Sequence, residues 1–120
     1  MKAGNLRMFD TTAIDSISKE YVTEINNIFG DKLRKVILYG SYARGDFDDE
    51  SDIDVMVLVD MQDEEIEKKW DDILNSKCEI DDKYNVFLSP QVKDISHFNK
   101  WLPYLPFYKN VYNEGVVWYG

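Results

Sequence analysis

Two aspartates stand two residues apart where an apolar run begins, in the sequence Asp52-Ile53-Asp54 followed by residues 55–59. Side chains at alternate positions of a strand point to the same face, so these carboxylates would share a face with their backbones ~6.6 Å apart. At an effective dielectric of 20, two such charges repel each other by roughly 2.5 kcal/mol. A divalent cation between them offsets that repulsion, and oxygen ligands without histidine or thiol favour Mg²⁺ or Mn²⁺ over zinc.

A second group of candidate residues, Gly40, Ser41 and Arg44, follows a short β-branched run. Glycine lets the backbone approach a ligand closely, and free N–H groups at the start of a helical turn favour phosphate. Arg44 could add a charge-assisted hydrogen bond to the same phosphates. If the two apolar runs form adjacent strands, the N–H donors and the carboxylate pair meet at one edge of the sheet. There they could hold a metal-bound triphosphate.

The plainer interpretation of such an acidic stretch is a solvated loop, because residues 46–54 contain six acidic side chains. Composition alone favours that interpretation. The spacing between Gly40-Ser41 and the pair Asp52 and Asp54 outweighs the solvated-loop interpretation. A strand-like run also precedes the first motif, and another begins at the second.

The hydrophobic pattern predicts eight elements around these motifs. Helices are expected over residues 12–29, 64–76, 94–101 and 107–114, and strands over residues 35–39, 53–59, 84–88 and 116–119. The run 53–59 is apolar on both faces after Asp54, as in a central strand buried on both sides. The order of elements predicts an α/β (α+β) fold, a small mixed sheet with helices mainly on one face.

Length and charge limit the function classes. A chain of 120 residues is predicted to be one domain, residues 1–120. With 23 acidic and 14 basic residues its formal charge is −9, which disfavours a nucleic-acid or membrane-surface binder. A single cysteine and a single histidine exclude an intrachain disulfide and a Cys/His zinc site. Without a membrane-length apolar run or a signal-peptide pattern, we expect a soluble, cytoplasmic protein.

The stretch from Gly40 to Asp54 resembles the signature of the nucleotidyltransferase superfamily typified by DNA polymerase β and kanamycin nucleotidyltransferase. Its longer form, Gly-Ser-x-Ala-Arg-Gly followed by Ser-Asp-Ile-Asp, is similar to that of the minimal nucleotidyltransferases, or MNT proteins. The resemblance implies that Asp52 and Asp54 are catalytic and bind two Mg²⁺ ions. It implies nucleotide binding by four residues, Gly40, Ser41, Arg44 and Ser51. The implied reaction transfers a nucleoside monophosphate, chiefly AMP from ATP, to a hydroxyl and releases pyrophosphate.

The family also uses a third carboxylate on the next strand. Over the strand predicted at residues 84–88, Asn85 stands at that position. Asparagine can coordinate Mg²⁺ weakly but cannot take a proton from an attacking hydroxyl. Asp81 or Asp82 could replace it if the strand register is shifted; otherwise both belong to a turn before the strand.

The acceptor is predicted to be another protein, because 120 residues leave no room for a domain that holds an antibiotic or a nucleic acid. In the MNT family the partner is commonly a HEPN-domain protein, so the resemblance implies an antitoxin that adds AMP to a tyrosine of a HEPN ribonuclease. Two alternatives stay open. One is a catalytically inactive module that binds nucleotide or masks its partner. The other is an aminoglycoside-type nucleotidyltransferase, which would need a homo-oligomer to complete its substrate walls.

Overall fold

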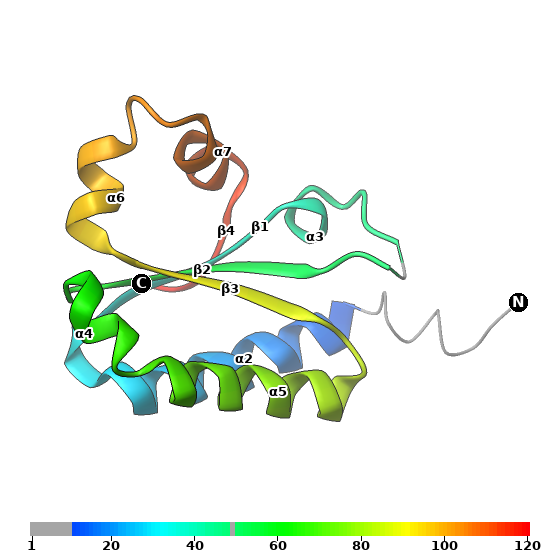
Figure 1. Cartoon of the computed structure of the whole chain (residues 1–120). Coiled ribbons are helices and arrows are strands. Elements are labelled where there is room, and N and C mark those ends of the chain that lie inside the picture. Colours follow the sequence, from blue (N-terminus) through cyan, green and yellow to red (C-terminus); the bar gives the residue numbers. More distant parts are fainter. Residues whose placement is uncertain (1–10, 49) are drawn as a thin grey trace, which may run out of the picture.

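A computed structural model describes residues 11–48 and 50–120 of the chain (Figure 1). It begins with helix α2 (Thr11–Phe29), which a short 3-10 turn, η1 (Gly30–Lys32), follows. Ile17, Tyr21, Ile25 and Phe29 are four residues apart and all buried. This spacing gives α2 one continuous apolar stripe, which packs on the sheet and confirms the helix predicted at residues 12–29.

Among the described residues, four strands form one mixed sheet, as predicted. They are β1 (Leu33–Tyr39), β2 (Ile53–Val59), β3 (Leu88–Asp94) and β4 (Val116–Tyr119), in the order β3-β2-β1-β4. β1 is antiparallel to both β2 and β4, whereas β2 and β3 are parallel. β2 therefore lies inside the sheet, and Val55–Val59 are buried throughout.

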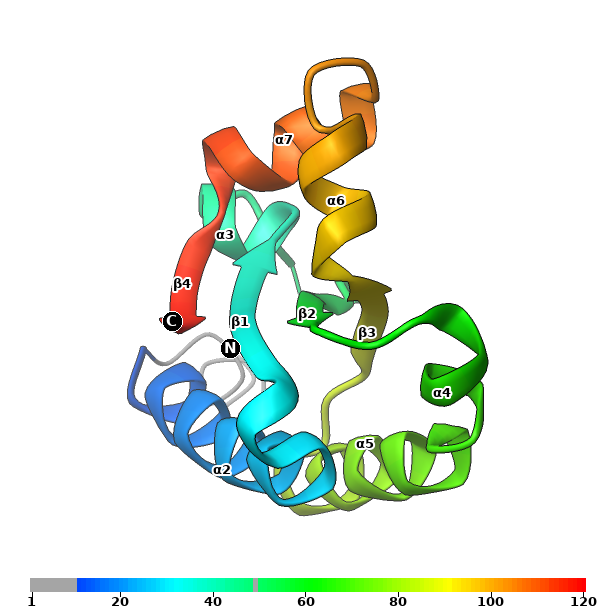
Figure 2. The same ribbon diagram turned by 90° about the vertical axis from the view of Figure 1, so that its left-hand side faces the viewer.

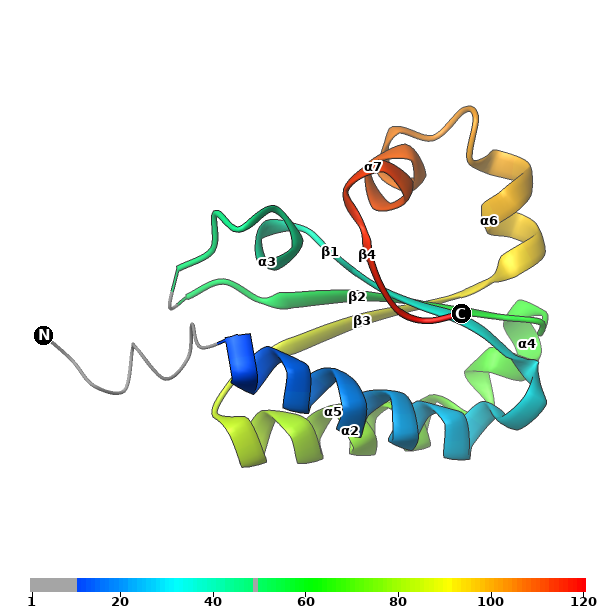
Figure 3. The same cartoon turned by 180° about the vertical axis from the view of Figure 1, so that it is seen from behind.

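The two faces of the sheet carry separate apolar cores. Alternate residues of β2, including Val55 and Val57, pack against α2 and α5 (Trp70–Tyr84). The residues between them, Met56 and Leu58, pack against Phe98 and the other buried residues of α6 (Ile95–Trp101) and α7 (Pro106–Glu114). Figures 2 and 3 show the long helices on one side of the sheet and the two shorter ones on the other. The two longest helices, α2 and α5, thus lie on one face of the sheet as predicted, while α6 and α7 cover the other face.

The helix predicted at residues 64–76 is in fact two helices, α4 (Asp63–Glu67) and α5, and the second runs eight residues further than expected. Gln62 and Glu65 form a capping box at the start of α4. Helix α5 continues to Tyr84 because Ile73, Ser76 and Ile80 keep one face of it buried. None of the helices among residues 11–48 and 50–120 is long and apolar enough to span a membrane.

The prediction of a strand at residues 84–88 was wrong, because β3 lies further along the chain. Tyr84 ends α5, and Asn85 caps that helix in the left-handed conformation, with φ 54° and ψ 52°. β3 begins only at Leu88, whose backbone N–H donates to Asp81 Oδ1 at 2.7 Å. Asn85 is therefore a helix cap and not a strand residue beside the carboxylate pair.

The C-terminal elements agree with the predictions at residues 94–101, 107–114 and 116–119 to within one residue. The side chain of Asp94 caps α6 by accepting from the Ser96 N–H at 3.0 Å. Pro106 starts α7 at a position where its missing N–H is not needed.

Candidate functional site

The two predicted motifs meet where β1 ends and β2 begins. In the antiparallel β1–β2 pair, Tyr39 lies directly opposite Asp54, and Gly40 follows Tyr39. By strand alternation, Asp54 shares its face with Met56 and Leu58, the face that α6 and α7 cover. Figure 1 shows the short helix α3 (Ser41–Arg44) at this end of the sheet, on the same side as α7.

Gly40 allows the closest approach in the site. Its backbone angles, φ 76° and ψ −155°, form a conformation that residues with a Cβ rarely adopt. A Cβ at this position would stand 2.4 Å from Asp54 Oδ2. The glycine thus places its bare backbone against the Asp54 carboxylate. The close approach of this backbone to a ligand stays a prediction.

Helix α3 is a single, tightly held turn. The Arg44 N–H donates to the Gly40 carbonyl at 3.0 Å, and the Gly45 N–H donates to the Ser41 carbonyl at 2.9 Å. The buried ring of Tyr42 stacks on Phe47, with centroids 4.3 Å apart and planes 3° apart. These contacts fix the loop that leads from β1 toward the aspartates.

Ser51 stabilises the turn before the carboxylate pair. Its Oγ accepts from the Asp48 N–H at 3.0 Å, and the Ser51 N–H donates to the Asp48 carbonyl at 3.2 Å. Asp48 Oδ1 in turn accepts from the Glu50 N–H at 2.9 Å. The structure therefore shows Ser51 shaping the loop; its predicted contact with a nucleotide stays a prediction.

The charged neighbours of Asp54 shift its pKa in opposite directions. Burial raises the pKa of Asp54 above its usual value, the negative charge of Asp52 raises it further, and Arg44 lowers it. Asp54 is half-buried while Asp52 is exposed. Ionisation of Asp54 thus costs free energy, and a cation beside the pair would relieve that cost.

Tyr39 adds a neutral polar group next to Asp54. Burial, and then the charge of Asp54, raise the pKa of Tyr39 to about 12. Its phenol therefore stays protonated at neutral pH. The ring meets Phe107 of α7 edge to face, with centroids 5.5 Å apart, so α7 packs directly beside the site.

Arg44 is held by two carboxylates, and the sequence pattern pointed to neither of them. Its Nε donates to Asp46 Oδ2 at 3.1 Å and its Nη1 to Glu114 Oε1 at 3.3 Å. Glu114 ends α7 and is 70 residues away in sequence, so no local spacing could have connected it to Arg44. All three side chains are exposed to solvent.

The third carboxylate is not where the strand prediction put it. On β3, Ser89 lies opposite Asp54 and Gln91 lies opposite Met56. Asp81 is engaged elsewhere, since it forms an ion pair with Lys77 and accepts from the Leu88 N–H. Asp82 is exposed on α5, which covers the opposite face of the sheet. Neither aspartate therefore replaces the missing group.

The carboxylate pair still suits magnesium. Mg²⁺ keeps several waters and is usually held by one or two carboxylates together with substrate phosphates. Asp52 and Asp54 supply two carboxylates. Within the described part of the chain, no cluster of three or more histidine, cysteine, aspartate or glutamate side chains could hold a metal by itself. Asp52 and Asp54 therefore fit a Mg²⁺ ion that the phosphates of the substrate would also coordinate.

Comparisons with known proteins agree with this geometry. A family model described as "Polymerase beta, Nucleotidyltransferase" matches residues 23–120, which include all four strands. The chain is 34% identical over 101 residues to "Putative protein adenylyltransferase MJ0604" of Methanocaldococcus jannaschii, covering 84% of this chain and 93% of the relative. It is 44% identical over 77 residues to "Putative protein adenylyltransferase MJ0141" of the same organism, covering 64% of this chain and 76% of the relative.

Proposed function

Since the chain belongs to the polymerase β-type nucleotidyltransferase family, we propose that it is a Mg²⁺-dependent adenylyltransferase that transfers AMP from ATP to a hydroxyl of a partner protein. The observation that carries this proposal is the contact between Gly40 and Asp54, which brings a bare backbone turn and a carboxylate pair to one point. The names of the two relatives support a protein as the acceptor.

In this proposal each motif has its own task. Gly40 and Ser41 hold the triphosphate through the backbone turn and the Ser41 hydroxyl, and Arg44 adds a positive charge. Ser51 contacts the nucleotide from the turn before the carboxylates. Asp52 and Asp54 would hold two Mg²⁺ ions. Such a pair of ions stabilises the attacking and leaving oxygens of an in-line displacement.

The residues on β3 that face the site offer no group that could take the proton of the acceptor hydroxyl. Ser89 and Gln91 face the same side as Asp54, and neither can take a proton at neutral pH. Tyr39 cannot take it either, because its phenol is already protonated. We therefore expect slow transfer, with the proton passing to solvent or to a group of the acceptor.

The finer proposal concerns the acceptor. We propose a HEPN-type protein as the partner, so that the pair acts as a toxin and its antitoxin in the cytoplasm. The resemblance to MNT proteins supports this choice. The acceptor residue would be a tyrosine, whose hydroxyl must reach the end of the sheet at Asp54.

Labelled transfer tests the activity. Wild-type protein is incubated with ATP labelled at the α-phosphate, Mg²⁺ and lysate of the source cell, beside the Asp52→Asn/Asp54→Asn variant. Asp60→Asn is the matched control, because Asp60 directly follows the other end of β2 and forms an exposed ion pair with Arg34. We expect a labelled protein band with wild type and Asp60→Asn only. Equal labelling by the double variant would refute the proposal.

A second candidate function rests on the missing third carboxylate. A module without a proton acceptor on β3 could bind nucleotide, or mask its partner, without transferring AMP. This candidate predicts that neutralisation of a HEPN-type toxin in co-expression survives Asp54→Asn. The adenylyltransferase predicts that the same substitution restores toxicity.

A further inference from the structure

Exposed apolar side chains concentrate at the C-terminal end of the described chain. Eight of the eleven large ones among the described residues lie between positions 101 and 119. Four of them lie on the edge strand β4 or on α7 just before it; we call Tyr112, Val116, Val117 and Tyr119 the β4 surface. Their exposed fractions run from 39% to 68%, so the edge strand and the end of α7 present several apolar groups to solvent.

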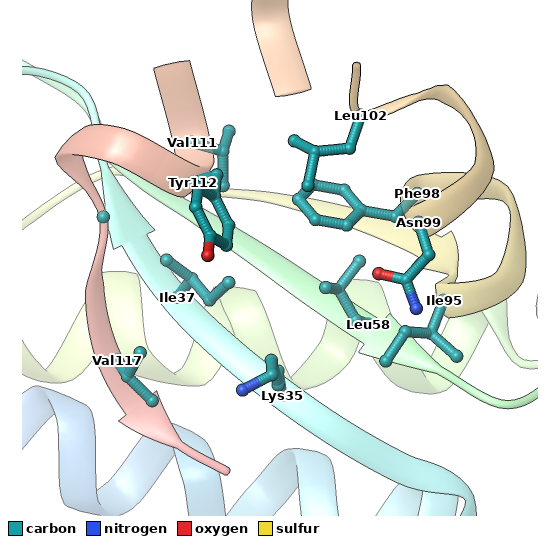
Figure 4. A pocket seen from close by; sticks show the side chains of 11 residues that line it. Lys35, Ile37, Leu58, Ile95, Phe98, Asn99, Leu102, Val111, Tyr112 and Val117 are labelled. Atoms are coloured by element: carbon teal, nitrogen blue, oxygen red, sulfur yellow. The ribbon is translucent and has the colours of Figure 1, made fainter. Parts of the chain in front are cut away.

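An open cavity of about 200 Å³ adjoins the β4 surface (Figure 4). Ile37 and Leu58 of the sheet, Phe98 of α6 and Val111 of α7 line it, and Tyr112 and Val117 of the β4 surface face it as well. Lys35 is the only charged side chain in the lining. The Lys35 Nζ donates to the Gly120 carbonyl at 3.2 Å, and most of the other lining groups are apolar, so the cavity suits an apolar side chain.

The cavity extends along the strands away from the carboxylate pair. Of its lining residues on β1, Ile37 is two residues and Lys35 is four residues from the Tyr39–Asp54 pair. At 3.3 Å per residue, these separations are about 7 Å and about 13 Å.

The two edges of the sheet differ in a way that matters for association. Natural sheets protect their edges with proline and charged residues. The β3 edge follows this rule, since it contains Pro90, Lys93 and Asp94. The β4 edge consists of Val-Val-Trp-Tyr and has neither. Trp118 packs against the core on the α2 side, which leaves the valines and Tyr119 to solvent.

The charge distribution favours a second copy as the occupant of this surface. Residues 95–120 contain one acidic residue, Glu114, of the 23 in the chain, and Glu114 is paired with Arg44. Elsewhere two copies with a formal charge of −9 each would bring acidic surfaces together. The C-terminal region is where two copies can approach with the least repulsion.

We propose that two copies of this chain associate through the β4 surface and the cavity beside it, about a two-fold axis. An isologous contact uses the same patch on both subunits, so the apolar groups of one copy are covered by those of the other. This proposal does not depend on adenylyl transfer. It also predicts that salt strengthens the dimer, because screening weakens the repulsion between the acidic remainders of the two copies.

Sedimentation equilibrium of the full chain over a range of micromolar concentrations tests the proposal. We expect wild type to show twice the monomer mass, and Val117→Lys to weaken the dimer by about tenfold or more. Leu74→Lys is the control, because Leu74 is an exposed apolar residue of α5 outside this surface. It should dimerise like wild type.

A wild type that stays monomeric at low and high salt would overturn the proposal. A dimer that survives both Val117→Lys and Tyr112→Glu would also overturn it, since the contact would then lie elsewhere. If Val117→Lys disturbs folding, Tyr112→Glu tests the dimer contact independently, because Tyr112 is an exposed residue of helix α7. Circular dichroism of each variant establishes that the monomers are folded.

Discussion

Asp54 has to meet two conflicting demands. A carboxylate that binds a cation must be ionised, yet burial and the neighbouring Asp52 both favour its protonated form. The folded protein therefore holds the Asp54 proton more tightly than the unfolded chain does. Its contribution to stability is full below the pKa of an unfolded aspartate, about 3.9, and is lost as the pH rises through the raised folded pKa.

Removal of the Asp54 charge should stabilise the empty protein at neutral pH. We expect Asp54→Asn to raise Tm by a few degrees at pH 7, a modest effect because Asp54 is partly solvated. The gain should shrink as the pH falls through the raised pKa of Asp54, where the wild-type carboxyl takes up its proton. Thermal unfolding followed by circular dichroism at several pH values measures this. A gain independent of pH would contradict the argument.

Gly40 offers a second test at the level of one residue, since an alanine there meets both backbone strain and Asp54. We expect Gly40→Ala to cost about 1–3 kcal/mol of unfolding free energy from strain alone and to abolish ATP binding. Gly45→Ala is the matched control, because Gly45 also has a positive φ, 84°, but nothing within 4 Å of the added Cβ. It should lose stability and keep ATP binding. If both variants bind ATP equally, the contact with Asp54 is unimportant.

At the scale of elements, α5 and β3 show why the strand position of the family's third carboxylate was assigned to Asn85. Tyr84, Val86 and Phe87 form a β-prone run that in fact spans the end of a helix and the loop after it. β3 itself contains Ser89, Pro90 and Lys93, which give little strand signal. Its conformation comes from parallel pairing with β2 and not from its own side chains. A local pattern cannot register that tertiary contact.

Asp81 should be structural and not catalytic. Its carboxylate accepts from the Leu88 N–H and pairs with Lys77, so it ties the end of α5 to the start of β3. We expect Asp81→Ala to cost about 1–3 kcal/mol in urea unfolding, because a partly buried N–H loses its partner. AMP transfer per folded molecule should not change. The exposed neighbour, in Asp82→Ala, should be neutral in both assays. Lost transfer at full stability in Asp81→Ala would make Asp81 part of the active site.

Other elements were predictable for a physical reason. β2 agrees with its prediction residue for residue, because a strand buried on both faces needs an unbroken apolar run. That Gly40 and the Asp52-x-Asp54 pair meet in one candidate site was also predictable, since both motifs are local. The Arg44–Glu114 ion pair and the Tyr39–Phe107 contact were not predictable, because each joins segments that only the fold brings together.

At the scale of the whole molecule, the sheet separates chemistry from association. Asp54 and Gly40 lie at one end of the β1–β2 pair, and the lining of the cavity begins about 7 Å further along the strands. Helix α7 connects the two regions, since Phe107 contacts Tyr39, Glu114 binds Arg44, and Val111 lines the cavity. The proposed active site and the proposed dimer contact thus share one helix, α7.

Calorimetric titration of ATP most directly tests whether Asp52 and Asp54 hold a magnesium-bound triphosphate. ATP is added to wild type, Asp54→Asn and Asp60→Asn, each with Mg²⁺ and again with excess EDTA. We expect wild type and Asp60→Asn to bind ATP only when Mg²⁺ is present, and Asp54→Asn to bind at least about tenfold more weakly. Equal affinity in Asp54→Asn, or binding that EDTA does not change, would contradict the proposed site.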